Sequence, residues 1–199
     1  MRKLQCQVRS VARLVAYWVV IIVGLSVWID GTGHAQTLTE MTRFDTASGQ
    51  AFNTRNIKEL QDWGFSLQFP QDWKVFYATG MVWAMNPGSG GFSVESEKVS
   101  KEYALPDYLA DVMQTIKTNA KTFELISPPA DITINGIPAR EFTFSATYQF
   151  GSGERETRYV IVFVSGKRGY SFACQAKPAE LAQAKKNNEP VLNSLKIVK

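Results

Sequence analysis

The chain has 199 residues and a formal net charge of +4, from 22 lysines and arginines against 18 aspartates and glutamates. The first 35 residues hold four of the basic residues and Asp30, so the remainder keeps 18 basic and 17 acidic residues (22 minus 4, and 18 minus 1). A chain this balanced has no electrostatic drive towards nucleic acid, so we expect no nucleic-acid partner.

Residues 1–35 have the pattern of a secretory signal peptide. Arg2, Lys3, Arg9 and Arg13 precede residues 14–29, a run without charge, and the small residues Gly33 and Ala35 then offer a cleavage site. The alternative is an uncleaved N-terminal anchor, although a spanning helix needs about 20 apolar residues. We expect an exported protein of the periplasm or extracellular space, or of the thylakoid lumen in a photosynthetic source. Membrane contact is expected only through residues 14–29, if they are retained.

Cleavage after Ala35 removes the only histidine, His34, and leaves one cysteine, Cys174. The mature chain then has no imidazole base, no histidine metal ligand and no internal disulfide. Cys174 stands in an apolar run and is expected to be inert core. Residues 36–58 are polar and are predicted to form a flexible leader ahead of a domain at residues 59–199.

The first half of the domain reads as short strands. Residues 64–69, 73–77, 81–85 and 92–99 are strand-like, and turn residues such as the Asn86–Gly91 cluster separate them. In the last strand, Phe92 and Val94 share one face while Glu95 and Glu97 share the other. A main helix is predicted over residues 106–121, because apolar residues recur there at helical spacing.

The second half alternates hairpins with a final helix. A short apolar stretch at 123–126 is followed by Ser127-Pro128-Pro129, and Asn135-Gly136 then predicts a tight turn between strands at 131–134 and 137–148. Residues 159–164 are apolar on both faces and predict a central strand, and residues 170–176 return beside it. A second helix starts at Pro178, Pro190 is expected to break it, and residues 194–198 are read as a last strand. The pattern predicts an α+β fold, a mainly antiparallel sheet with helices on both faces.

The candidate chemical groups all have a plainer interpretation. Glu95 and Glu97 lie about 7 Å apart along a strand and are weak candidates for binding a hard cation, but the wet face of a sheet is the favoured reading. Glu154, Arg155, Glu156 and Arg158 are read as solvated charge pairs. No catalytic residue, cofactor site or other metal site is predicted. Four aromatic residues are weak candidates for anchoring a partner if they prove exposed: Trp63, Trp73, Trp83 and Tyr148.

Three segments resemble the PsbP-like proteins, whose superfamily includes DcrB-like bacterial proteins. They are the opening GFSLQFPQDW at 64–73, the hairpin INGIPARE at 134–141, and the closing NSLKI at 193–197, with Tyr170 opening the strand after Lys167-Arg168-Gly169. The resemblance spans most of residues 63–198, and every matching segment is a turn or core element. It implies an α-β-α sandwich that is generally non-enzymatic and serves as an extrinsic subunit, assembly factor or chaperone-like binding module.

We therefore expect an exported, non-catalytic protein that binds another protein, including a membrane-associated complex during assembly or maintenance. The alternative is a small-ligand or cation carrier with a pocket between helix and sheet. A histidine-free hydrolase or lyase is the least favoured hypothesis, because no pair of residues has recognisable catalytic spacing.

Overall fold

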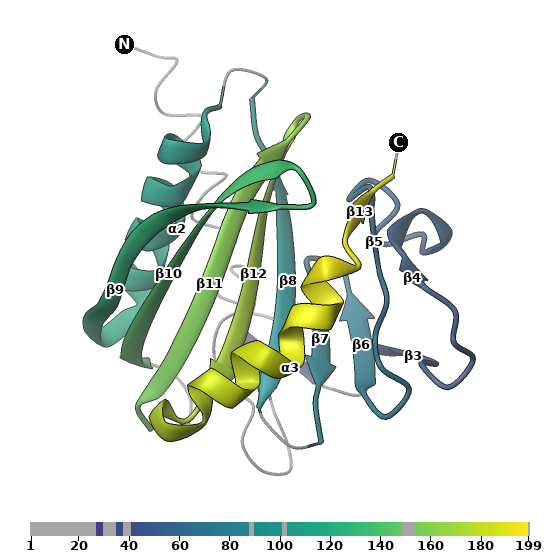
Figure 1. Cartoon of the computed structure of the whole chain (residues 1–199), viewed down its shortest axis with the longest axis horizontal. Helices are drawn as coiled ribbons and strands as arrows, with labels where there is room; N and C mark the ends of the chain where they lie inside the picture. The colour runs from purple at the N-terminus through teal and green to yellow at the C-terminus, as the bar shows by residue number, and fades with distance from the viewer. Residues whose placement is uncertain are drawn as a thin grey trace.

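The computed structural model describes residues 27–29, 35–37, 41–87, 90–100, 103–148 and 154–198 (Figure 1). Most of the predicted signal peptide therefore lies outside the described residues, as do the turn residues 88–89 and 151–153. Near the N-terminus, β1 (Val27–Ile29) pairs with β2 (Ala35–Thr37) as a separate antiparallel ribbon.

An eight-stranded sheet forms the centre of the fold, and every neighbouring pair in it is antiparallel. Successive side chains of its long central strands point to opposite faces of the sheet, and both faces are buried, as the apolar run at 159–164 predicts. The strands, in their spatial order, are β3 (Thr42–Phe44), β6 (Lys74–Ala78), β7 (Met81–Met85), β8 (Gly91–Lys98), β12 (Arg168–Ala176), β11 (Glu156–Ser165), β10 (Ile137–Tyr148) and β9 (Ala120–Ile134).

Helix α2 (Leu105–Asn119) packs against the β9–β11 end of the sheet. Pro106 stands in its first turn and Asp107 complements the positive end of the helix dipole. The apolar stripe predicted from the sequence buries Tyr108, Leu109 and Ile116, which form one core cluster with side chains of β10 and β11 such as Val160 and Val162.

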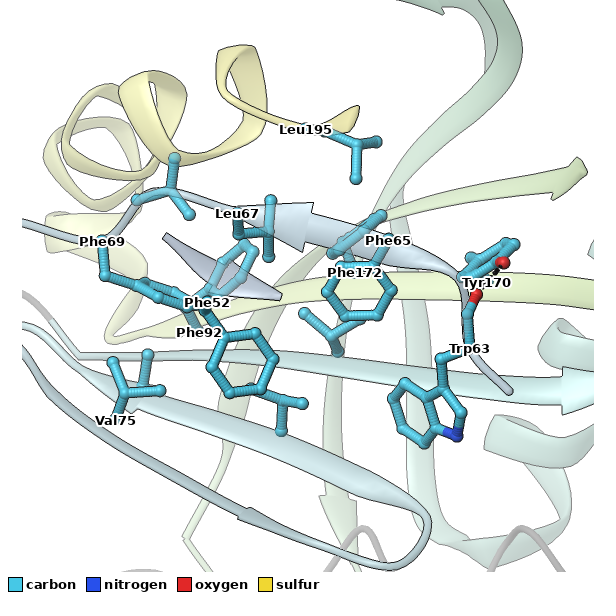
Figure 2. Packing of buried hydrophobic residues seen from close by; sticks show 14 of the residues in the cluster. Phe52, Trp63, Phe65, Leu67, Phe69, Val75, Phe92, Tyr170, Phe172 and Leu195 are labelled. Atoms are coloured by element: carbon cyan, nitrogen blue, oxygen red, sulfur yellow. Dashed lines mark hydrogen bonds between the residues drawn. The ribbon is translucent and has the colours of Figure 1, made fainter. Parts of the chain in front are cut away.

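A second core cluster lies between the sheet and two other elements, helix α3 and a small sheet (Figure 2). The small sheet joins β13 (Lys196–Ile197), β5 (Phe65–Leu67) and β4 (Phe52–Asn53), and α3 (Leu181–Asn193) follows the 3-10 turn η4 (Pro178–Glu180). Aromatic rings dominate this cluster, and Phe65 packs against Tyr170 and Phe172 with centroids 6.2 Å away in each case. The α+β class and the large antiparallel sheet are confirmed.

The predicted leader at 36–58 is wrong for most of its length. Residues 42–56 contribute β3, β4 and the 3-10 turn η3 (Thr54–Asn56), and Phe52 is fully buried. Thr54 is buried as well, and its hydroxyl both donates to the Phe65 carbonyl at 2.9 Å and accepts from the Phe65 amide at 3.0 Å. This segment folds into the domain although it has few apolar residues, because hydrogen bonds satisfy the polar groups that become buried.

Two proline segments also differ from the prediction. Ser127-Pro128-Pro129 does not break the chain into two strands, because β9 runs through it as one strand at the edge of the sheet, where a missing amide is tolerated. Helix α3 likewise continues through Pro190. The carbonyl that loses its amide partner there belongs to Lys186, an exposed residue that water can reach.

Candidate functional site

The aromatic residues considered as partner anchors are mostly core residues. Trp63 and Trp73 are each 4% exposed and Tyr148 is 6% exposed. These three side chains are therefore too buried to contact a partner. Trp83 is half-buried, and its ring lies so close to Gly91 that a Cβ at that position would stand 2.2 Å from the ring. These rings therefore serve packing within the domain.

Glu95 and Glu97 lie in a partly buried polar cluster between β8 and α2. Glu95 is 4% exposed, so the predicted wet face is wrong at this position. Tyr108 of α2 donates a hydrogen bond to Glu97, and Asp111, one helical turn further, adds a second negative charge near Glu97. We call Glu95, Glu97, Tyr108 and Asp111 the Glu97 cluster.

The electrostatics of the Glu97 cluster favour a bound proton. Burial and the charge of Asp111 raise the pKa of Glu97 to about 7, against the lowering effect of the Tyr108 hydrogen bond. Burial also raises the pKa of Asp111, and burial with the neighbouring carboxylates raises that of Tyr108 well above its ordinary value. Within the described ranges, no three histidine, cysteine, aspartate or glutamate side chains are grouped so that they could hold a metal ion.

The predicted solvated charge pairs are only partly solvated. Arg158 has a side chain only 4% exposed, and its two guanidinium nitrogens Nε and Nη2 donate to Glu156 at 3.2 and 2.7 Å. Its guanidinium also lies 4.8 Å from the centre of the Tyr148 ring. The pair is part of the core, where removing one partner would leave a buried charge.

Cys174 is buried, as predicted, with 3% of its surface exposed. Burial raises the pKa of its thiol to about 11, and the Asn188 side-chain amide donates a hydrogen bond to its Sγ at 3.0 Å. The thiolate needed for nucleophilic chemistry is therefore disfavoured.

Strand β9 presents the exposed apolar surface of the described chain. Leu125 is 39% exposed and Ile126 is 53% exposed, and they are the large hydrophobic residues found exposed among the described residues. In the pairing of β9 with β10, Leu125 stands opposite Phe144 and Ser127 opposite Thr143, which leaves Ile126 as an extra residue. Such a bulge re-aims a side chain, which accounts for the exposure of Ile126.

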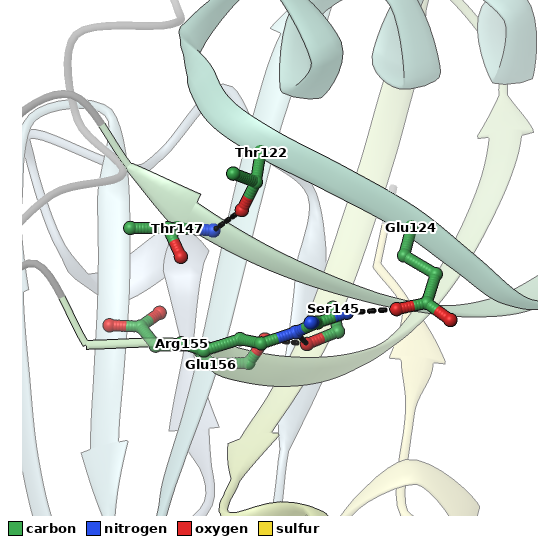
Figure 3. Close-up of polar contacts among 6 residues, drawn as sticks. All are labelled: Thr122, Glu124, Ser145, Thr147, Arg155 and Glu156. Atoms are coloured by element: carbon green, nitrogen blue, oxygen red, sulfur yellow. Dashed lines mark hydrogen bonds and ion pairs between the residues drawn. The ribbon is translucent and has the colours of Figure 1, made fainter.

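Polar contacts fix β9 onto β10 beside these apolar residues (Figure 3). Arg155 donates through Nε to the Ser145 hydroxyl at 2.8 Å and forms an ion pair with Glu124 of β9. The Thr122 hydroxyl accepts from the Thr147 amide at 3.1 Å. The strand that carries Leu125 and Ile126 is thus held against β10 by hydrogen bonds and an ion pair.

Sequence reasoning missed this surface. Leu125 and Ile126 fall in the short apolar stretch at 123–126, and nothing in that stretch alone indicates that its side chains are exposed. The signal that could have identified the edge is the adjacent Pro128-Pro129 pair, because proline within a sheet is confined to edge strands and bulges.

The model of a family described as PsbP-like protein matches residues 14–197 of the chain. No curated protein matches it. Among the described residues, no helix is long and apolar enough to cross a membrane.

Three solved structures resemble the fold at low sequence identity. A Bacteroides thetaiotaomicron protein has a TM-score of 0.51 at 15% identity over 80% of this chain, which spans only about half (49%) of that protein. Cyanobacterial PsbP (CyanoP) from Synechocystis has a TM-score of 0.50 at 12% identity, over 80% of this chain and 94% of its own. A Pseudomonas aeruginosa protein of unknown function, described as a candidate regulator, has a TM-score of 0.50 at 15% identity, over 65% and 88%.

Proposed function

The chain belongs to the PsbP-like protein family, and from that premise we propose that it is an exported, non-catalytic protein that binds another protein. The partner we propose is a component of a membrane-associated complex, which the chain serves as an assembly or maintenance factor. The observation that carries the proposal is the pair Leu125 and Ile126, exposed together on strand β9.

Exposed apolar side chains that lie next to one another are the usual mark of an interaction surface. The other large aromatic and aliphatic residues of the described sheet are buried or half-buried, so contact with a partner at β9 would remove the most exposed apolar side chains from water. Arg155 and Glu124 flank the two residues, with side chains 54% and 64% exposed, and supply a polar rim.

The non-catalytic part of the proposal is supported by the state of the titratable groups. The only histidine, His34, belongs to the segment that we expect to be cleaved with the signal peptide, and Cys174 is buried with a raised pKa. The Glu97 cluster combines a carboxyl group with a pKa of about 7 and a tyrosine, but Tyr108 is 1% exposed and unavailable to a substrate. The proposal of export is supported by the pattern of residues 1–35.

The test is affinity capture of the tagged full chain from the envelope membranes of its own host. A double variant, Leu125→Asp with Ile126→Asp, places two charges at the exposed apolar positions and should lose the captured partner. A matched control, Thr79→Asp with Ala182→Asp, adds the same two charges at exposed positions away from β9. Loss of the partner in both double variants, or in neither, would contradict the proposed binding surface.

A further inference from the structure

We propose that the partner binds as an extended segment that adds a ninth strand to the main sheet along residues 120–127 of β9, which we call the β9 edge segment. This inference rests on the proposed function and deepens it, because it names the kind of partner segment that the surface takes. Four observations on the described residues lead to it.

The first observation is the length of the open edge. The main sheet ends in β3 on one side, a strand of three residues, and in β9 on the other, a strand of 15 residues. The small sheet ends in two strands of two residues each. An unpaired strand edge presents a row of backbone donors and acceptors, and short edge strands are one of the ways in which proteins limit it. Strand β9 is not limited in this way.

The second observation is that the edge is closed in one part and open in another. Pro128 and Pro129 have no amide hydrogen, and the register with β10 shifts between Glu141 and Thr143, opposite this proline pair. An added strand therefore cannot pair regularly through residues 128–129. The β9 edge segment before them contains no proline and keeps every amide. Its pairing with β10 has bulges at Lys121 and Ile126, so the regular part of the segment is Thr122 to Leu125.

The third observation is that the β9 edge segment is held in place before any partner arrives. The Phe123 ring stacks on Phe144 with centroids 5.5 Å apart, and the ammonium group of Lys117 lies 5.4 Å from the centre of the Phe123 ring. Thr122 and Glu124 are fixed by the contacts with Thr147 and Arg155 described above. Little ordering of the edge is then needed on binding, which favours affinity.

The fourth observation concerns the side chains that an added strand would meet. Leu125 and Ile126 are exposed beside the backbone edge, and Lys121 is exposed towards the start of the segment. In strand addition the main-chain hydrogen bonds give affinity, and side chains along the edge give specificity. The occupant is therefore an extended peptide segment of another protein, with apolar residues opposite Leu125 and Ile126 and an acidic residue near Lys121.

A second copy of this chain fits the edge less well. In antiparallel self-pairing centred on Ile126, the residues opposite Phe123 and Glu124 of one copy are Pro129 and Pro128 of the other. Proline cannot donate a backbone hydrogen bond, and one of these two adjacent positions faces the added strand, so each copy would lose a donor close to the centre of the ladder. An extended segment without proline has no such loss.

The experiment uses the full chain and a phage-displayed library of random ten-residue peptides as the probe. We expect enriched peptides that form strands, that carry apolar residues with an acidic residue, and that slow hydrogen exchange of the amides in residues 120–127. In such a peptide, alternate backbone amides face β9 and the others face away. Methylation of the amides that face β9 should weaken binding at least tenfold, and methylation of the others should have little effect. Leu125→Lys with Ile126→Lys should also weaken binding at least tenfold, with the unfolding midpoint in urea unchanged.

Other outcomes would overturn the inference. These are a library with no enriched binder, binders that protect amides elsewhere, or methylated peptides that all bind equally. Dimers that dissociate on Ile126→Asp, seen by light scattering, would assign the edge to a second copy instead. If affinity capture still depends on Leu125 and Ile126 while backbone methylation has no effect, the proposed function stands and strand addition fails.

Discussion

At the scale of single residues, the ring of Tyr108 lies directly against Gly169 of β12 and leaves no room for a side chain there. A Cβ at residue 169 would stand 2.4 Å from the Tyr108 ring, well inside van der Waals contact. Gly169→Ala should therefore push α2 away from the sheet and lower the free energy of unfolding by about 1–3 kcal/mol, the usual range for overpacking. Urea unfolding measures it. In a Tyr108→Ala background the same substitution should have a much smaller effect, and an equal effect in both backgrounds would refute the contact.

Glu97 gives the fold a dependence on pH with a definite sign. Its pKa is about 7 in the folded state and 4.5 as the ordinary value, so between these values the native state binds more protons than the unfolded state. Its contribution to stability then falls as pH rises from about 4.5 to about 7 and is constant above that range.

Glu97→Gln removes this buried charge and should stabilise the protein more at pH 8 than at pH 5. The difference is about 3 kcal/mol at most, since each pH unit between the two pKa values is worth about 1.4 kcal/mol. Urea unfolding at both pH values measures it. Glu59→Gln, at an exposed position, is the matched control. An equal effect of Glu97→Gln at pH 5 and pH 8 would show that this carboxyl group does not carry the raised pKa.

At the scale of elements, the turn between β9 and β10 is joined to the end of α3. Asn135 adopts a left-handed backbone with φ of 51°, and its side-chain amide donates to the carbonyls of Asn193 at 3.1 Å and Leu195 at 2.9 Å. The Asn-Gly pair therefore does more than form the tight turn expected from the sequence, because it also positions one end of β9 against the helix.

Asn135→Gly keeps the turn geometry and removes the two side-chain hydrogen bonds, so it should lower the free energy of unfolding by about 1–2 kcal/mol. Asn135→Ala should lower it by about 1 kcal/mol more, because alanine is strained at positive φ. Thermal or urea unfolding of both variants measures the two effects. If Asn135→Gly is as stable as the parent, the link between the hairpin and α3 contributes nothing.

The elements that sequence patterns predicted well are those with a strong period or a strong turn. The alternation in residues 137–148 and the apolar run at 159–164 mark β10 and β11, and the helical stripe at 106–121 marks α2. The errors arise where tertiary contacts decide. Phe52 is a single large apolar residue in a polar segment, and it becomes core only through rings distributed along the chain, those of Phe44, Phe65, Phe69 and Tyr77. The sequence pattern predicts that Glu95 and Arg158 are exposed to solvent. Both are buried, because other elements of the fold cover the sheet where they lie, and no neighbouring residue indicates this.

At the scale of the whole molecule, the core clusters bury most apolar side chains of the main sheet and leave β9 as its long open edge. The residues that form this edge surface could be located only when the pairing of β9 with β10 and the bulge at Ile126 were known. Charge balance and the presence of a single histidine, by contrast, are properties of composition, and they direct the functional hypothesis towards binding from the outset.

The central claim is that β9 is the surface through which the chain binds a protein partner. The most direct measurement is backbone hydrogen exchange of the full chain, free and in complex with the partner captured from its own host's membranes. We expect slower exchange concentrated in residues 120–127, and loss of both complex and protection in the Leu125→Asp, Ile126→Asp double variant. A stable complex in which these amides exchange as fast as in the free protein would contradict it.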